Sequence, residues 1–263
     1  MDDLFVQTTN QYMQVLEEYP DSKNLAWLLG PKSSFFMEGI YESVECVTKW
    51  CPPGSQVIDF GCATGLFTAQ LQARGIQAFG LDIVVHETGV ETIWQAWRSL
   101  QPLVGARFSF YDGKHIPFAD NSVDGIVAHA VLEHIPSDNL SFTLTELYRI
   151  IRPGGFLFIF STPRPQSYAE WIVGSSIGKR MGLHGHELLL HERDLQNDLQ
   201  MIGFNIREIK RTDLIIAQLP GRFQNILNLF TPITLKLDRL LLNTPLSWFA
   251  HHSWIVSSKG KDN

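Results

Sequence analysis

Short hydrophobic runs alternate along this chain with segments of helical spacing, and glycine or proline turns separate them. The predicted strands cover residues 56–60, 76–81, 107–111, 123–131, 156–160, 204–209 and 252–257. The predicted helices between them cover residues 66–74, 87–100, 139–151 and 187–202. Regular alternation of strand and helix predicts an α/β fold with a doubly wound, mostly parallel, seven-stranded sheet.

Two segments break this alternation. Residues 1–50 have helical spacing with Tyr12 on the apolar face, and we interpret them as an N-terminal helical lid. Residues 213–250 predict an insertion of short helices before the last strand, segmented by prolines. We interpret this insertion as a cap packed on the sheet. An apolar substrate pocket, or a membrane contact helped by Lys236 and Arg239, remains an open alternative.

Composition narrows the class of protein. The chain has 263 residues, of which 44% are hydrophobic and 18% charged, which suits one globular domain over residues 1–263. A net charge of −6 argues against a nucleic acid partner. Three cysteines cannot all pair, which favours a reducing, cytoplasmic setting. An acidic N-terminus without a basic, then apolar, segment predicts no signal peptide, and no apolar run is long enough to predict a membrane-spanning helix.

The glycine turn after the first predicted strand is the clearest candidate for ligand binding. A strand, a glycine turn and a helix together favour a bound nucleotide or nucleoside. Gly61 and Gly65 bound this turn, but Leu66 stands where a dinucleotide fingerprint has its third glycine. Asp59 just before the turn would repel a diphosphate and would suit a positive amino group. The turn therefore predicts a cationic nucleoside ligand without phosphates.

Two further acidic residues follow neighbouring predicted strands. Asp82 lies about 20 residues past the glycine turn, where acids bind ribose hydroxyls in such folds. Asp112 ends the third predicted strand, beside Gly113. Because the carboxyl ends of parallel strands meet at one edge of a sheet, we expect these acids to border one ligand crevice.

At this point the sequence resembles class I S-adenosylmethionine-dependent methyltransferases of the small-molecule type, which includes ubiquinone and menaquinone biosynthesis enzymes. Six sequence blocks carry the resemblance in the family's order: residues 57–65, 80–82, 112–118, 122–127, 131–135 and 146–155. One block would be weak, but six with family-like gaps are specific. The resemblance implies that residues 55–162 form a cofactor-binding core.

The family implies S-adenosylmethionine as cofactor and S-adenosylhomocysteine as product. The implied cofactor-binding positions are Asp59, Gly61, Cys62, Ala63, Gly65, Asp82, Ile83, Asp112, Gly113 and His129. Within this set, Asp82 would hold the ribose hydroxyls and Ile83 would pack on adenine. Gly113, with Asp112, would meet the adenine edge, and His129 would face the sulfonium. Ala63 stands where the family usually has glycine.

The chain shows no obvious acid–base pair, but methyl transfer from a sulfonium depends mainly on alignment. A general base is needed only where the acceptor must lose a proton, as a phenol or a carbonyl-stabilised carbon does. His134 and His129 are the candidate catalytic residues. The spacing of His184, His186 and His191 does not place them on one helix face, so we predict no metal site.

The preferred hypothesis is an enzyme that methylates a small organic acceptor of apolar, aromatic or lipid-like character. Tyr168, Glu170 and Trp171 are candidate lining residues of the acceptor pocket. One alternative is a non-catalytic protein of the same fold that serves as a binding or partner subunit. Another is a different nucleoside-utilising enzyme, such as an aminopropyl transferase, which the blocks fit poorly.

Overall fold

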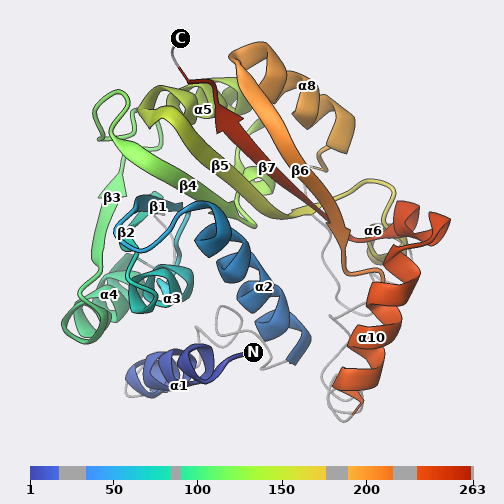
Figure 1. The fold of residues 1–263 in the computed structure, drawn as a ribbon, viewed down its shortest axis with the longest axis horizontal. Coiled ribbons are helices and arrows are strands. Elements are labelled where there is room, and N and C mark those ends of the chain that lie inside the picture. Colours follow the sequence, from blue (N-terminus) through green and yellow to red (C-terminus); the bar gives the residue numbers. More distant parts are fainter. Residues whose placement is uncertain (18–33, 84–89, 176–188, 216–229, 262–263) are drawn as a thin grey trace.

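The computed structural model describes residues 1–17, 34–83, 90–175, 189–215 and 230–261. Seven strands within these residues form one sheet in the order β3-β2-β1-β4-β5-β7-β6 (Figure 1). The strands are β1 (Gln56–Phe60), β2 (Gln77–Ile83), β3 (Arg107–Tyr111), β4 (Val123–His129), β5 (Ile151–Pro163), β6 (Phe204–Thr212) and β7 (His252–Lys259). Among these strands β7 alone runs antiparallel to the direction of the other six. The predicted fold class is confirmed.

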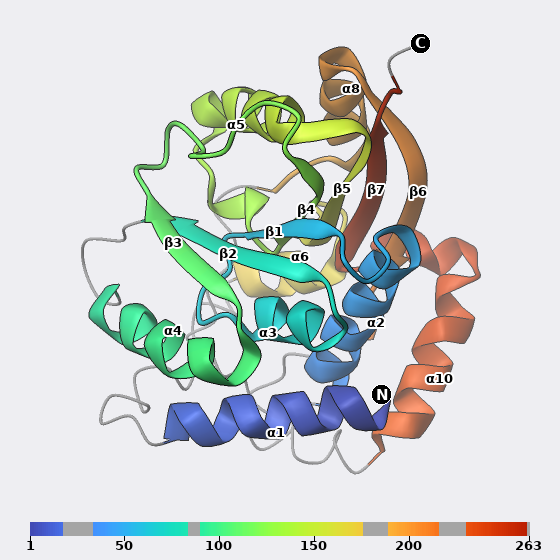
Figure 2. The ribbon, with the colours of Figure 1, turned by 60° about the vertical axis from the view of Figure 1, so that its left-hand side comes forward.

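Helices cover both faces of the sheet. They are α1 (Asp3–Glu17), α2 (Ser34–Trp50), α3 (Leu66–Ala73), α4 (Val90–Val104), α5 (Ser137–Ile150), α6 (Tyr168–Gly174), α8 (Glu192–Ile202) and α10 (Thr231–Leu242), with the 3₁₀ turns η1 (Leu132–His134) and η2 (Pro245–Phe249). Figure 2 shows α1, α3 and α4 on one side of the sheet and α5 and α8 on the other. Two apolar clusters fill these layers, one against α5 and α8 and one against α2 and α3.

Several predicted strand limits were wrong, among them limits of β2, β6 and β7, and those of β4 and β5 have a clear physical reason. β4 ends at His129 instead of residue 131, because Ala130 takes a left-handed φ of 53° that an extended strand cannot continue. β5 begins at Ile151 and includes the glycines that we expected to lie before it. Gly155 sits so close to β4 that a Cβ there would lie 2.7 Å from the Asp124 carbonyl oxygen, so only glycine lets the strands pair.

The two segments outside the alternation are helical where the structure describes them. α1 and α2 fall within residues 1–50, and α10 and η2 fall within the predicted insertion. Pro232 and Pro245 lie at the starts of α10 and η2, where proline costs no hydrogen bond. α10 is tied to α2 through Arg239, which is 3.1 Å from Glu38 and 2.7 Å from Glu42. Among the described helices, none has the length and apolarity needed to cross a membrane.

Candidate functional site

The carboxyl ends of β1, β2, β3 and β4 meet at one edge of the sheet. Asp59 on β1 pairs with Gly80 on β2, and Ile83 at the end of β2 pairs with Tyr111 at the end of β3. On its other side β1 pairs with β4, so that His129 follows directly on this edge. The chain therefore brings together the predicted cofactor residues, which come from four separate segments.

The glycine turn uses its own amides inside the protein. The Leu81 carbonyl oxygen accepts the N–H groups of Gly61 at 2.7 Å and Cys62 at 3.2 Å. Ala63 N–H donates to Asp82 Oδ2 at 2.6 Å, and Gly65 N–H donates to the Cys62 carbonyl at 2.8 Å. These four amides are not offered to a ligand. The turn is therefore poorly suited to a pyrophosphate, in agreement with the phosphate-free ligand expected from the sequence.

Glycine is required at both limits of the turn. Gly61 has a φ of 74° and Gly65 a φ of 89°, the left-handed region that other residues avoid. A Cβ at Gly61 would lie 2.4 Å from the Val131 side chain, and one at Gly65 would lie 2.6 Å from Phe108. Ala63 also has a left-handed φ, at 45°, so its alanine side chain is carried with backbone strain where the family usually has glycine.

Asp82 joins the turn to the next strand. One of its carboxylate oxygens accepts the Ala63 N–H, and the other accepts the Ile83 N–H at 2.7 Å. Each oxygen keeps a further lone pair for a ligand hydroxyl. Burial raises the pKa of Asp82, while the two backbone hydrogen bonds oppose that shift. This geometry fits the predicted ribose role.

Asp59 is buried deeply behind the turn, with 2% of its surface exposed. Its Oδ2 accepts the Thr68 hydroxyl at 2.6 Å. Burial, with a contribution from the nearby Asp82 carboxylate, raises its pKa to about 7. Ionising this buried carboxyl costs free energy. A ligand cation beside it would lower that cost, because an opposite charge favours the ionised form. The Cys62 side chain is also buried, so this residue contributes backbone rather than a thiol.

The third acid differs from the other two. The Asp112 carboxylate is exposed and accepts the backbone N–H groups of Lys114 at 2.8 Å and His115 at 3.1 Å. These hydrogen bonds lower its pKa. Its side chain therefore closes a local turn beside Gly113. The exposed Ile83 side chain, 43% accessible on the same edge, presents the apolar surface expected for adenine packing.

His129 ends β4 and lies against the aromatic rings of Phe67 and Phe160, at centroid distances of 5.6 and 6.4 Å. Its Nε2 is 3.3 Å from Ser161 Oγ. Burial, and then the charge of His252, lower its pKa to about 4, so the ring is neutral at pH 7. His134, the other catalytic candidate, is exposed at the end of η1. Its catalytic role stays a prediction.

Sequence reasoning missed two residues that support the turn. Trp97 of α4 donates its indole N–H to the Ala63 carbonyl at 2.9 Å and stacks on Phe108. Tyr12 of α1 was predicted only as part of an apolar face, yet its hydroxyl is hydrogen-bonded to Thr64. Nothing in either residue's spacing signals a polar partner, because both partners are distant in sequence.

The same edge of the sheet continues past β4 through β5, β7 and β6. Because β7 is antiparallel, its first residue, His252, lies at this edge, paired with Pro163 of β5 and Thr212 of β6. His252 Nδ1 is 2.8 Å from Asp213 Oδ2. The sequence analysis did not single out either residue, since 39 positions separate them.

The expected acceptor residues fall on α6, which begins with Ser167 as N-cap. Trp171 is highly exposed at 77%. The Glu170 carboxylate lies 3.9 Å from His251 Nε2. These positions lie after β5 on the substrate side of the edge, and their lining role stays a prediction.

Metal ligation was not predicted, and the described residues hold no group of three or more His, Cys, Asp or Glu side chains that could bind an ion. His184 and His186 lie outside the described residues. His191 is the N-cap of α8, and its Nδ1 is 3.0 Å from Gln166 Nε2.

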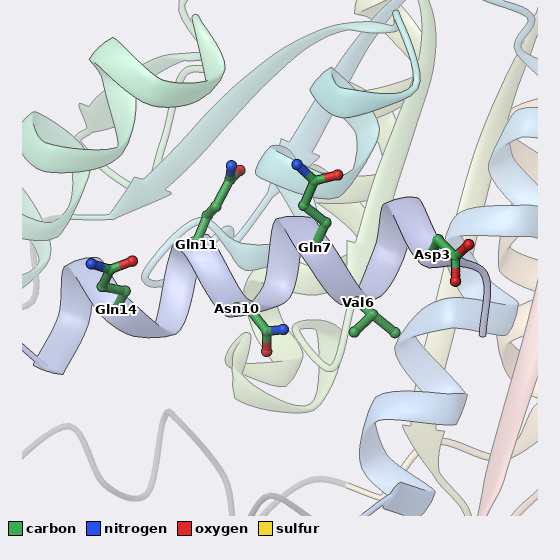
Figure 3. A pocket seen from close by; sticks show the side chains of 6 residues that line it. All are labelled: Asp3, Val6, Gln7, Asn10, Gln11 and Gln14. Atoms are coloured by element: carbon green, nitrogen blue, oxygen red, sulfur yellow. The ribbon is translucent and has the colours of Figure 1, made fainter.

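A separate open depression of about 440 Å³ lies along α1 (Figure 3). Its lining residues are Asp3, Val6, Gln7, Asn10, Gln11 and Gln14. All of them belong to one helix and are exposed to solvent. We assign no ligand to this surface.

Comparison with known proteins finds that this chain is similar to methyltransferases. Residues 58–159 match the model of the methyltransferase domain. An uncharacterized methyltransferase of Mycobacterium sp. (strain JLS) is 31% identical over 140 residues, 53% of this chain and 48% of that protein. A ubiquinone biosynthesis O-methyltransferase of Burkholderia thailandensis is 23% identical over 60% of this chain and 68% of its own length. The chain thus spans about half the length of the first of these relatives.

A solved structure shares the fold over the whole chain. The 1,6-didemethyltoxoflavin-N1-methyltransferase of Burkholderia thailandensis, solved with 1,6-didemethyltoxoflavin and S-adenosylhomocysteine, has a TM-score of 0.56. It is 15% identical and covers 100% of this chain and 92% of its own. Residues 58–159 thus match a methyltransferase domain, and the solved structure shows that the chain shares the fold of a methyltransferase.

Proposed function

We propose that this protein transfers a methyl group from S-adenosylmethionine to a small organic acceptor. The observation that supports this most directly is the glycine turn, whose amides are used internally while Asp59 and Asp82 lie beside it. Such a turn disfavours phosphates and favours a ligand with hydroxyls and a positive amino group.

The residues present fit this cofactor. Asp82 would accept the ribose hydroxyls, since each carboxylate oxygen already holds one N–H and retains accepting capacity. The raised pKa of the buried Asp59 carboxyl means that a nearby ammonium group would favour its ionised form. Ile83 offers an exposed apolar side chain next to Gly113, 3.6 Å from the position of a Cβ there. These contacts support adenine packing between β2 and β3.

When bound, S-adenosylmethionine supplies an electrophilic methyl group on a neutral leaving group. The chain's part is to align the acceptor and exclude water. Phe67 and Phe160 pack on His129 at the end of β4 and make this part of the edge apolar. With a pKa of about 4, His129 stays neutral at pH 7 and adds no positive charge beside a sulfonium.

The acceptor is proposed to be apolar, aromatic or lipid-like. The relative named as a ubiquinone biosynthesis enzyme supports this class. So do the half-exposed Trp248 and Phe249 of η2, which follow α10 within the insertion. A reaction in the cytoplasm is consistent with the proposal.

A contact between α10 and a membrane surface is a further part of the proposal. Phe230, Ile233, Leu237 and Leu240 lie along one helical stripe and are 52%, 68%, 47% and 59% exposed. Exposed apolar stripes beside basic residues favour the interface of a lipid bilayer. Lys236, exposed on the same helix, supplies a basic group.

Calorimetric titration with S-adenosylhomocysteine tests the proposed function. We expect saturable binding to the wild-type chain. Binding at about 1 mM ligand requires a binding free energy of only about 4 kcal/mol, so an absence of heat at that concentration would contradict the cofactor assignment. A second experiment tests methyl transfer. The protein is incubated with labelled S-adenosylmethionine and cell extract, and the labelled products are identified by mass spectrometry. Binding without any labelled product would favour the non-catalytic alternative.

A further inference from the structure

The Asp213–His252 pair has the arrangement of a histidine held by a carboxylate. His252 Nδ1 and Asp213 Oδ2 are 2.8 Å apart, and the same oxygen accepts the Thr212 hydroxyl at 2.9 Å. A carboxylate can only accept here, so the proton of the neutral ring lies on Nδ1. That tautomer leaves the lone pair of His252 Nε2 available to take a proton.

The pair lies at the edge of the sheet that carries the candidate cofactor residues. His252 is paired with Pro163 and Thr212 at the ends of β5 and β6, on the edge that carries the cofactor residues. The charge of His252 contributes to the lowered pKa of His129. The His252 side chain keeps 17% and the Asp213 side chain 30% of its surface exposed. Both are therefore within reach of a ligand.

The backbone around the pair is strained and firmly held. Asp213 has a φ of 62° and Ser161 a φ of 57°, left-handed values for residues that are not glycine. The His251 N–H donates to the Asp213 carbonyl at 3.0 Å, and the His251 carbonyl accepts the Arg164 N–H at 2.9 Å. Strain that the surrounding structure maintains is concentrated at functional sites.

We propose that Asp213 and His252 form the general base of the reaction, and that the acceptor is methylated on an ionisable hydroxyl such as a phenol or enol. This inference rests on the proposed methyl transfer and narrows its substrate class. A carboxylate acceptor, already ionised at pH 7, would need no such base.

The step balances without any other reactant. His252 Nε2 takes the proton of the acceptor hydroxyl, and an oxygen electron pair forms the new bond to the methyl carbon. The carbon–sulfur bond breaks, and its electron pair stays on sulfur. The imidazolium is stabilised by the Asp213 carboxylate and later releases its proton to solvent.

His252 suits this role better than the two histidines predicted from the sequence. A pKa of about 4 makes His129 a poor proton acceptor at pH 7. His134 is exposed to solvent. The titratable groups in contact with His252 are Asp213, which follows β6, and the adjacent His251, whose Nε2 is 3.9 Å from the Glu170 carboxylate of α6. The charge of His252 also acts on His129 of β4, whose pKa it lowers.

His251 provides a matched control. Its ring lies 4.0 Å from that of His252, but its Nδ1 is bound to Ser167 Oγ at 3.0 Å instead of to a carboxylate. The variants are therefore His252→Gln, Asp213→Asn and His251→Gln. Each is checked for an unchanged melting temperature and unchanged S-adenosylhomocysteine affinity, which separates a catalytic loss from misfolding or loss of the cofactor site.

The assay uses catechol, 4-nitrocatechol and benzoate as acceptors, with labelled S-adenosylmethionine, between pH 5 and 9. Catechol must lose a proton on the enzyme, whereas 4-nitrocatechol is largely ionised already at the upper end of this range. For His252→Gln we expect kcat with catechol to fall about 100-fold or more. We expect a much smaller loss with 4-nitrocatechol at high pH. Wild-type activity with catechol should fall at acid pH, because a protonated His252 cannot accept a second proton, and His251→Gln should keep this profile.

Equal losses with both catechols would overturn the proposal, as would a wild-type pH profile in His252→Gln. Methylation of benzoate alone, or of none of the three by a chain that binds S-adenosylhomocysteine, would overturn the hydroxyl acceptor class. Absence of S-adenosylhomocysteine binding to the wild-type chain would instead overturn the proposed function, and this inference with it.

Discussion

The Tyr12 hydroxyl is hydrogen-bonded to the Thr64 hydroxyl, which joins α1 to the middle of the glycine turn. Both residues are buried, and burial raises the pKa of Tyr12, so the phenol stays protonated. Gln70 of α3 adds a second attachment, since its amide donates to the Phe5 carbonyl and to Thr9 Oγ1, each at 3.0 Å. The N-terminal helix is therefore part of the support of the cofactor turn.

Tyr12→Phe should remove the buried hydrogen bond and leave the Thr64 hydroxyl without this partner. We expect the free energy of unfolding to fall by about 1–2 kcal/mol, because an unpaired buried hydroxyl carries a desolvation cost. Urea denaturation followed by circular dichroism measures the change. Tyr41→Phe on α2, whose ring packs edge-on against Phe5, serves as the control. An equal fall in the free energy of unfolding in both variants would show that the hydrogen bond to Thr64 does not contribute specifically to stability.

Asp82→Ala should weaken S-adenosylhomocysteine binding by about 1–3 kcal/mol, through loss of charge-assisted hydrogen bonds to the ribose. Asp112→Ala is the comparison, because that carboxylate is exposed and already bound to its own turn. We expect a smaller loss there. Calorimetry on both variants, together with Asp82→Asn, measures the difference. Equal affinities for Asp82→Ala and the wild type would show that the ribose role is wrong.

The hydrophobic pattern was sufficient to predict the sheet, because buried parallel strands read as apolar runs between turns. The errors at the end of β4 and the start of β5 came from single residues whose conformation depends on neighbouring strands. The left-handed φ of Ala130 ends β4 two residues earlier than predicted. Gly155 lies inside β5, although its local sequence is typical of a turn. Neither outcome is encoded in the local spacing, because β4 and β5 decide it by pairing with each other.

The candidate cofactor residues could be located from the sequence because they sit in contiguous blocks at strand ends, and their role in binding stays a prediction. The Asp213–His252 pair could not, since its members meet only when the antiparallel β7 returns to the edge of the sheet. The exposed turn role of Asp112 also depends on local backbone geometry. In physical terms, local periodicity reports which face is buried, whereas long-range pairing decides which polar groups meet.

Asp59 should make stability depend on pH between about 4 and about 7. Its pKa rises from an ordinary value of 3.8 to about 7 on folding, so in this range the folded state binds more protons than the unfolded state. The free energy of unfolding contributed by this group therefore falls as pH rises through the window. Asp59→Asn, which can still accept the Thr68 hydroxyl, should flatten this slope. Thermal or urea denaturation at several pH values measures it.

The same group provides an independent binding readout. A bound ammonium group favours the ionised Asp59, so S-adenosylhomocysteine binding should release protons near pH 7 and tighten as pH rises. Calorimetry in buffers of different ionisation enthalpy detects that release. Asp59→Asn is expected to lose it, and an unchanged proton release in this variant would assign the effect to another group.

The exposed stripe on α10 predicts binding to anionic lipid vesicles. Replacing Ile233 and Leu240 together by Asp should reduce co-sedimentation with mixed phosphatidylcholine and phosphatidylglycerol vesicles by about tenfold or more, because each apolar side chain contributes roughly 1 kcal/mol or more when buried. Met201→Asp on α8 is the control, since Met201 is 78% exposed but lies away from the stripe. Vesicle binding that is equally lost in the control, or kept in the α10 variant, would remove this helix from any membrane contact and leave the stripe as acceptor or cap surface.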